Sequence, residues 1–190
     1  APRITALLAI LVALTFLIYQ LRHSDYIPVA TQSNLSDPTS WLIYLKLAWI
    51  PAFGISIEFA LDGLSLLMIA LTLILGAVAV SASWTDIKKH QGFFEANVLW
   101  TLAGVIGVFT ALDLFLFFLF WEVMLIPMYF IIAIWGHENR GYAAMKFFIF
   151  TQASGLLMLV SAIALANIHE ETNGHYSFSY FDLINLPLGY

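Results

Sequence analysis

The sequence predicts an all-α integral membrane protein with five transmembrane helices and one long extracytoplasmic loop. Of its 190 residues, 62% are hydrophobic and only 10% are charged, whereas about a quarter of the residues are charged in a typical soluble domain. The few charges separate five apolar runs, each long enough to cross a bilayer. So few charges could not cover a water-exposed surface, so we expect most of the chain to contact lipid or other apolar protein.

The apolar runs predict helices at about 4–22, 63–85, 94–112, 114–136 and 143–168. Roughly 17–25 apolar residues cross a hydrocarbon core about 30 Å thick, because a helix rises 1.5 Å per residue. The runs do not alternate between polar and apolar residues, as barrel strands do. The first run is longer than the apolar region of a signal peptide, and no small-residue cleavage motif follows it before Arg22. We therefore expect five membrane helices.

Two segments lie outside these helices. The loop 23–61 is rich in Pro, Ser and Thr, and its apolar, aromatic part at 41–49 suits a short helix lying at the membrane interface. The tail 169–190 is more polar but retains several aromatic residues, which is typical of another interfacial segment. The chain begins with Ala-Pro rather than Met, so we expect residues 1–190 to be one partial membrane domain.

The basic residues predict the orientation in the membrane. One side of the bilayer would hold Arg3, Lys88, Lys89, Arg140 and Lys146. The opposite side would hold only Arg22 and Lys46. Because Lys and Arg accumulate in short cytoplasmic loops, the first end of this chain is predicted to be cytoplasmic and the last end periplasmic.

The composition excludes several kinds of binding. A net charge of −5 argues against nucleic acid, which requires a basic surface. The chain contains no cysteine, so it holds no disulfide, no thiolate-bound zinc and no cysteine-ligated iron–sulfur cluster. His137, His169 and His175 lie at or beyond helix ends and lack the spacing of a metal site. We expect this chain to bind neither a metal nor a cofactor.

Glu122 is the residue most indicative of function. It lies eight residues beyond Leu114, about 12 Å into its predicted helix. A carboxylate at that depth costs several kcal/mol and is expected to face protein or water rather than lipid. Such a group can bind and release protons when a charged partner biases it. The alternative is a protonated glutamate that only forms a hydrogen bond between helices.

Pro127 lies five residues further along the same helix. It has no N–H to donate to the carbonyl of Val123, and its ring pushes against that carbonyl, so a kink is expected. Unpaired carbonyls beside a buried acid would offer water a place to bind. Lys146 opens the last helix, where its ammonium can reach water. If Lys146 turns inward, it is a candidate relay partner.

Small residues and one acid are predicted to have structural roles. Gly104, Gly107 and Gly155 would let neighbouring helices approach closely. Asp62 immediately precedes the second helix, and a carboxylate at that position is typical of a helix N-cap.

Three long strings of the sequence resemble one family. They are DGLSLLMIALTLILG from Asp62, GFFEANVLWTLAGVIGVFTALDLFLFFLFWEVMLIPMYFIIAIWG from Gly92 and MKFFIFTQASGLLML from Met145. They resemble the subunit M family of bacterial NADH:quinone oxidoreductase, which is respiratory complex I, with the mitochondrial chain 4 subunit as counterpart. The run from Trp121 to Tyr129 is more similar to this family than to the antiporter-like sister subunits L and N.

The resemblance implies a proton-translocating subunit without a redox centre, which is not catalytic alone. NADH, FMN, the iron–sulfur clusters and quinone would bind other subunits. Subunits of this family have an antiporter-like fold of about fourteen helices. They lie in the bacterial inner membrane between the L- and N-type sister subunits. In the family, the glutamate matching Glu122 pairs with a lysine on a later helix. A chain with five helices would then be a fragment that carries only the acid of this pair.

Two alternatives remain open from the sequence. The chain could be a structural or assembly scaffold of the same membrane arm, in which Glu122 only holds helices together. It could also be part of a related cation/proton antiporter, which shares the fold.

Overall fold

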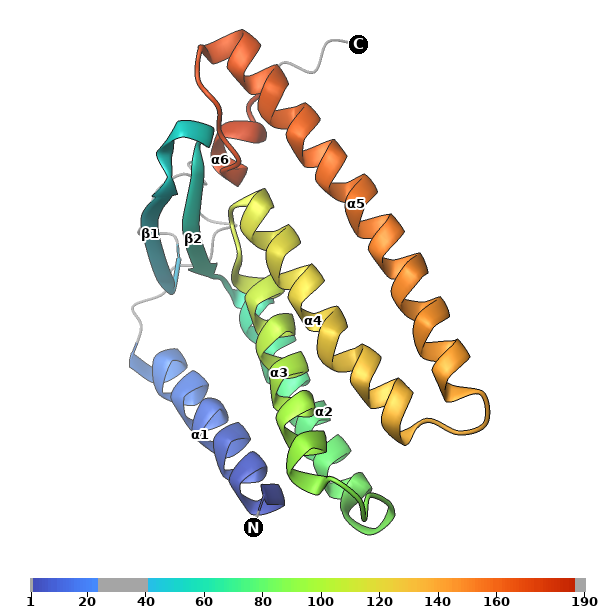
Figure 1. Ribbon diagram of the computed structural model, residues 1–190. Coiled ribbons are helices and arrows are strands. Elements are labelled where there is room, and N and C mark those ends of the chain that lie inside the picture. The colour runs from blue at the N-terminus through green and yellow to red at the C-terminus, as the bar shows by residue number, and fades with distance from the viewer. Residues whose placement is uncertain (1, 24–40, 187–190) are drawn as a thin grey trace.

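The computed structural model describes residues 2–23 and 41–186, which form a helical bundle with a β-hairpin at one end (Figure 1). The long helices are α1 (Pro2–His23), α2 (Gly63–Asp86), α3 (Gln91–Thr110), α4 (Leu114–Trp135) and α5 (Arg140–Asn173). Each is long and apolar enough to cross a bilayer. The five predicted membrane spans are therefore confirmed, in a chain that is mostly helical but not all-α.

The hairpin corrects one part of the prediction. Strands β1 (Ile43–Ile50) and β2 (Ile55–Leu61) pair antiparallel around a short 3-10 turn, η3 (Pro51–Phe53). The interfacial helix expected at 41–49 is therefore wrong, and the predicted loop 23–61 contains two strands; residues 24–40 of that loop lie outside the described residues. The apolar composition of 41–49 fits a helix as well as a strand. The segment forms a strand because its backbone pairs with β2, which is a separate part of the chain.

The hairpin turn depends on a glycine. Gly54 ends η3 with φ at +65°, a left-handed conformation that favours glycine. A Cβ at this position would also lie 1.9 Å from the carbonyl oxygen of Tyr176. Gly54 therefore lets the hairpin turn pack directly against the segment that follows α5.

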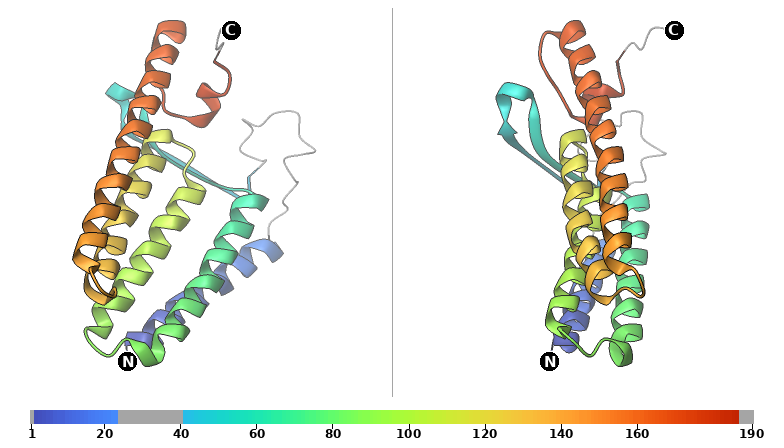
Figure 2. Two further views of the ribbon diagram at one scale, coloured as in Figure 1. Left: turned by 90° about the vertical axis from the view of Figure 1, so that its right-hand side faces the viewer. Right: turned by 45° about the vertical axis from the view of Figure 1, so that its right-hand side comes forward.

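Helices α2 to α5 lie side by side in chain order, and α1 crosses beside α2 and α3 (Figures 1 and 2). The hairpin lies at the end of the bundle where α3 connects to α4, and the short helix α6 (Tyr180–Leu183) lies at this end too. We call this end of the bundle the hairpin end. The opposite end holds the connections 87–90 and 136–139, and we call it the turn end.

Capping residues set the helix ends. The Ser65 N–H donates to Asp62 Oδ1 over 2.7 Å, which confirms Asp62 as the N-cap of α2. Helix α5 continues to Asn173, five residues beyond the apolar run, and ends at Gly174, whose φ is +77°. The Gly174 N–H donates to the carbonyl of Glu170. This helix therefore ends where a left-handed glycine closes it and not where hydropathy falls.

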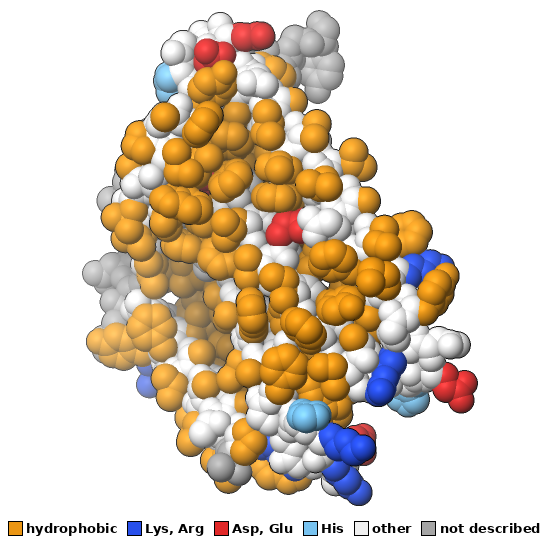
Figure 3. Space-filling model, in the orientation of Figure 1, with side chains coloured by type: hydrophobic (Ala, Val, Ile, Leu, Met, Phe, Trp, Pro, Cys, Tyr) orange, Lys and Arg blue, Asp and Glu red, His pale blue; other side chains and the backbone are white. Residues whose placement is uncertain are grey.

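The surface of the bundle is predominantly apolar. Figure 3 shows hydrophobic side chains over most of the visible face, with Lys and Arg gathered toward its lower end, which is the turn end. On α5, the side chains of Phe150 and Leu157 are 68% and 71% exposed. An apolar surface of this extent suits contact with lipid or with other apolar helices.

Candidate functional site

Helix α4 carries Glu122 and packs closely against α3. A Cβ at Gly104 would lie 2.7 Å from Met124 Cβ, and one at Gly107 would lie 2.2 Å from the ring of Phe120. These two glycines therefore permit an approach that a larger residue would block. Successive helical residues are rotated by about 100°, so residues 120 and 124 share one face of α4 and Glu122 lies on the opposite face.

That opposite face meets α5 at a third glycine. Glu122 Oε1 is buried, and a Cβ at Gly155 would lie only 1.9 Å from it. Oε1 also has no hydrogen-bond partner among the described residues. Buried carboxylate oxygens are normally hydrogen-bonded, because leaving one unpaired costs about 1–3 kcal/mol or more. Gly155 therefore makes room for the carboxyl group of Glu122, whose Oε1 accepts no hydrogen bond from the described residues.

Pro127 lies inside α4, and its side chain is fully buried. The helix continues through it to Trp135. Pro127 provides no N–H, so the carbonyl of Val123, one residue after Glu122, lacks its helical donor. An acceptor without its usual partner therefore lies in the same turn as the acid, and the predicted kink remains a prediction.

Lys146 lies apart from Glu122. It is exposed, and its Nζ lies 5.8 Å from the centre of the Tyr142 ring. Nine residues separate it from Gly155, about 13 Å along α5 by helical rise. Within the described ranges, no ion pair joins it to Glu122. The structure therefore brings Glu122 and Pro127 together on α4 but does not bring Lys146 to them.

A fully buried acid lies in the hairpin and was not predicted. Glu58 is 0% exposed and lies opposite Lys46 across the two strands. The Tyr44 hydroxyl donates to Glu58 Oε1 over 2.7 Å, and Lys46 Nζ lies 3.2 Å from Oε2. Both oxygens of this carboxylate therefore have partners, which is the usual condition for burying a charge.

Asp113 joins the hairpin to α4. Its Oδ1 accepts the N–H groups of Phe115 and Leu116, which makes it the N-cap of α4. Its Oδ2 accepts the Ser56 N–H over 2.9 Å and lies 3.2 Å from Ser56 Oγ. The same hydroxyl lies 3.3 Å from Glu58 Oε2, so its single hydrogen can serve only one of the two acids at a time.

Burial changes the titration of this cluster. Removal from water raises the pKa of the Asp113 carboxyl above its ordinary value, although the donors from Ser56, Leu116 and Phe115 oppose that change. Burial also raises the pKa of the Tyr44 phenol, and the hydrogen bond to Glu58 adds to this effect. Both groups therefore hold their protons to higher pH than they would in water.

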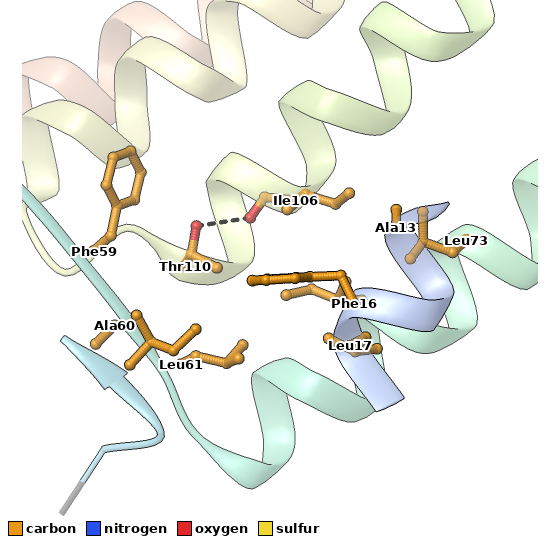
Figure 4. A pocket seen from close by; sticks show the side chains of 11 residues that line it. Ala13, Phe16, Leu17, Phe59, Ala60, Leu61, Leu73, Ile106 and Thr110 are labelled. Carbon is orange, nitrogen blue, oxygen red and sulfur yellow. Dashed lines mark hydrogen bonds between the residues drawn. The ribbon is translucent and has the colours of Figure 1, made fainter. Parts of the chain in front are cut away.

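One apolar cavity among the described helices offers no comparable chemistry. A cavity of about 250 Å³ lies between α1, α2, α3 and the hairpin, lined by residues such as Phe16, Leu61 and Leu73 (Figure 4). The hydroxyl of Thr110, which lines this cavity, donates to the carbonyl of Ile106 over 2.9 Å. In residues 2–23 and 41–186, no group of three or more His, Asp or Glu side chains is arranged to hold a metal ion.

Comparison with known proteins identifies the class. Residues 111–186, which include Glu122, Pro127 and Gly155, match the transmembrane family described as NADH:quinone oxidoreductase/Mrp antiporter. The chain also superposes along its whole length on a chain of respiratory complex I from Thermus thermophilus with bound NADH. The TM-score is 0.71 at 26% identity, and 36% of the Thermus chain is covered. The fold therefore resembles part of an antiporter-like membrane subunit of respiratory complex I.

Individual relatives narrow the class to one subunit. The chain is 55% identical over 153 residues to NADH-quinone oxidoreductase subunit M of Escherichia coli K12, and 54% identical over 154 residues to that of Pseudomonas aeruginosa. Each alignment covers 78% of this chain and 30% of the relative. The chain is a homologue of subunit M of NADH:quinone oxidoreductase, and it spans about 30% of the length of these curated relatives.

Proposed function

We propose that this chain is part of the proton-translocating membrane-arm subunit of NADH:quinone oxidoreductase, with Glu122 as a proton relay. Homology to subunit M supports the complex, and the packing of Glu122 supports the role. The observation that carries the proposal is the buried Oε1, which lies against Gly155 without a hydrogen-bond partner. Carboxyl groups within membrane helices are rare and commonly mark proton or ion pathways.

Glu122 would bind a proton at its carboxylate and release it when a neighbouring positive charge approaches. Within the described part of the chain, no basic side chain forms an ion pair with it. We therefore propose the lysine that the family places on a later helix as its partner, rather than Lys146. The energy would come from quinone reduction on other subunits, since this chain supplies acid–base groups only.

Orientation and neighbours belong to the same proposal. The turn end carries Arg3, Lys88, Lys89 and Arg140, which favours the cytoplasmic side of a bacterial inner membrane. The hairpin end would then face the periplasm. The L- and N-type antiporter-like subunits are the proposed neighbours, and they would cover part of the apolar surface of the bundle.

The test replaces Glu122 by Gln in the intact complex. NADH-driven proton uptake is measured in inverted membrane vesicles, together with the amount of assembled complex. Glu122→Gln keeps the side-chain shape but cannot titrate, so we expect coupled pumping to fall by about 10²-fold, the contribution typical of a positioned acid–base group. Glu138→Gln is the matched control, because Glu138 is an exposed acid at the turn end. Pumping at the wild-type rate by Glu122→Gln would refute the relay.

The close contact with Gly155 also suits a scaffold, in which Glu122 only holds α4 against α5. A scaffold should tolerate Glu122→Gln and lose the subunit on Glu122→Ala, because the alanine leaves the space beside Gly155 unfilled. Normal assembly with lost pumping in Glu122→Gln distinguishes the relay from this scaffold.

A further inference from the structure

Another buried acid lies at the turn end, far from both Glu122 and the hairpin. Glu95 is 3% exposed and lies one turn into α3. Its only electrostatic partner among the described residues is Arg3 of α1. The side chain of Arg3 is 14% exposed and that of Glu95 is 4% exposed. An acid and a base therefore meet where α1 and α3 come together, inside the bundle rather than on its rim.

The two charges do not form a direct hydrogen bond. Arg3 Nε lies 3.9 Å from Glu95 Oε1, beyond the distance over which N–H donates to oxygen. Arg3 Nε and Glu95 Oε2 are both buried, and neither has a hydrogen-bond partner in the described chain. A buried donor and a buried acceptor therefore have unmet bonds at the same place, a geometry that one bridging water, or a proton on the carboxylate, would satisfy.

Two further contacts hold Arg3 in place. Its guanidinium donates to the carbonyl of Ile87 in the α2–α3 connection and lies over the ring of Trp84, 5.5 Å from the ring centre. Arg3 is therefore held by α1, by the end of α2 and by the turn that follows. Glu95 meets a cation whose position is set by other groups, so the pair can lose or gain a proton without Arg3 leaving the site.

Further polar groups lie along α3 beyond Glu95, on the face opposite to it, because successive helical residues are rotated by about 100°. Asn97 is buried, its amide donates to the Phe93 carbonyl, and the Thr101 hydroxyl donates to the Asn97 carbonyl. One turn further, Gly104 meets Met124, two residues from Glu122 on α4. Nine residues, about 13 Å of helix, separate Glu95 from Gly104. Asn97 and Thr101 therefore add polar groups on α3 between the turn end and the contact with α4, although Met124 lies on the face of α4 opposite to Glu122.

We propose that Glu95 and Arg3 form a hydrated proton-binding site, at which Glu95 takes up protons at the turn end for delivery toward Glu122. The inference deepens the proposed function and rests on it. The step is a proton transfer only: a hydronium ion at the turn end protonates Glu95 Oε2 and leaves water. Arg3 remains positively charged throughout, because a guanidinium does not deprotonate in proteins.

Other charges at this end set the background of the titration. Those on the end of α2, on the two connections and at the start of α5 are Asp86, Lys88, Lys89, His90, His137, Glu138 and Arg140. Within the described ranges, none of them forms an ion pair with Glu95. Arg3 is therefore the group whose removal should alter the proton affinity of Glu95 most strongly.

The test uses the intact complex in inverted membrane vesicles. NADH-driven proton uptake is measured from acidic to alkaline pH for Glu95→Gln, Arg3→Gln and the matched control Glu138→Gln. A positioned proton-transfer group contributes about 10²-fold or more, so we expect Glu95→Gln to slow pumping by about tenfold or more at the alkaline end, where protons are scarce. Arg3→Gln should shift the pH profile, and Glu138→Gln should match the wild type.

A Glu95→Gln complex that assembles normally and has the rate and pH profile of Glu138→Gln would overturn the inference. If Glu95→Gln does not assemble, Glu95→Asp carries the test, because it keeps an acid with a shorter reach; an unchanged pH profile in that variant also overturns it. Infrared spectra give an independent readout: a carboxyl band that is sensitive to H/D exchange and absent in Glu95→Gln supports the site.

The outcome is separable from the proposed function. If Glu122→Gln abolishes pumping while Glu95→Gln does not change it, the function stands and the entry site is wrong. If Glu122→Gln pumps normally, the proposed relay itself fails, whatever Glu95→Gln does.

Discussion

Gly155→Ala tests the geometry of the candidate site without touching the acid. The added methyl group would lie 1.9 Å from Glu122 Oε1 and 3.1 Å from its Cδ, and real Cβ atoms essentially never approach within 3.0 Å. The carboxyl group must therefore retreat by more than 1 Å. Because the clash is at the end of a flexible side chain, rotation of Glu122 can relieve it at about 0.5–1.5 kcal/mol.

The expected result is loss of function with little loss of stability. Misplacing a reacting group by about 1 Å can lower a rate by about 10²-fold. We expect Gly155→Ala complexes to assemble, to melt within a few degrees of the wild type and to pump protons far more slowly in inverted vesicles. Gly141→Ala is the matched control, because Gly141 lies on the same helix and a Cβ there would meet nothing within 4 Å.

A second variant identifies the clash as the cause. Glu122→Asp shortens the side chain by one methylene, so Gly155→Ala should harm it less than it harms the wild type, a coupling that a double-mutant cycle measures. Equal pumping by Gly155→Ala and Gly141→Ala would contradict this prediction, since it would mean that the position of the Glu122 carboxylate is irrelevant to proton transfer.

Two predictions concern the hairpin end. Asp113→Ala removes the N-cap of α4 and the hydrogen bonds to Ser56, so we expect a destabilisation of about 1–3 kcal/mol. The measurement is the melting temperature of the purified complex, which should fall. Ser154→Ala, on the exposed surface of α5, is the control. For Tyr44, burial raises the pKa above 10.0, so the native state keeps a proton that the unfolded chain releases. The free energy of unfolding should therefore fall as pH rises above about 10, and Tyr44→Phe should reduce that fall in thermal melts. Equal pH dependence of the wild type and Tyr44→Phe would contradict the prediction.

The two helix-capping acids show how far local patterns extend. Asp62 and Asp113 each precede an apolar helix, which is the usual position of an N-cap. The sequence predicted this role for Asp62, and the same signal at Asp113 would have supported the same prediction. No local pattern indicates that Asp113 also binds Ser56, because the two residues are 57 positions apart and meet only through the fold.

The buried acids at the two ends show a different obstacle. Glu95 and Glu58 lie near the ends of apolar segments, where hydropathy treats an acid as a boundary. Their burial follows from partners on other elements, Arg3 on α1 and Lys46 on β1. The sequence signal that could have found Glu58 is the alternation within 43–50, which places Tyr44 and Lys46 on one face of a strand.

The membrane class, the five spans, the family and the place of Glu122 within the fourth apolar run could all be predicted from the sequence. These depend on hydropathy and on contiguous strings of residues, which are local properties of the chain. Tertiary structure alone decided the hairpin in place of an interfacial helix, the contact between Glu122 and Gly155, and the meeting of Arg3 with Glu95. Each of these joins residues from different elements, and their proximity arises only when the helices pack.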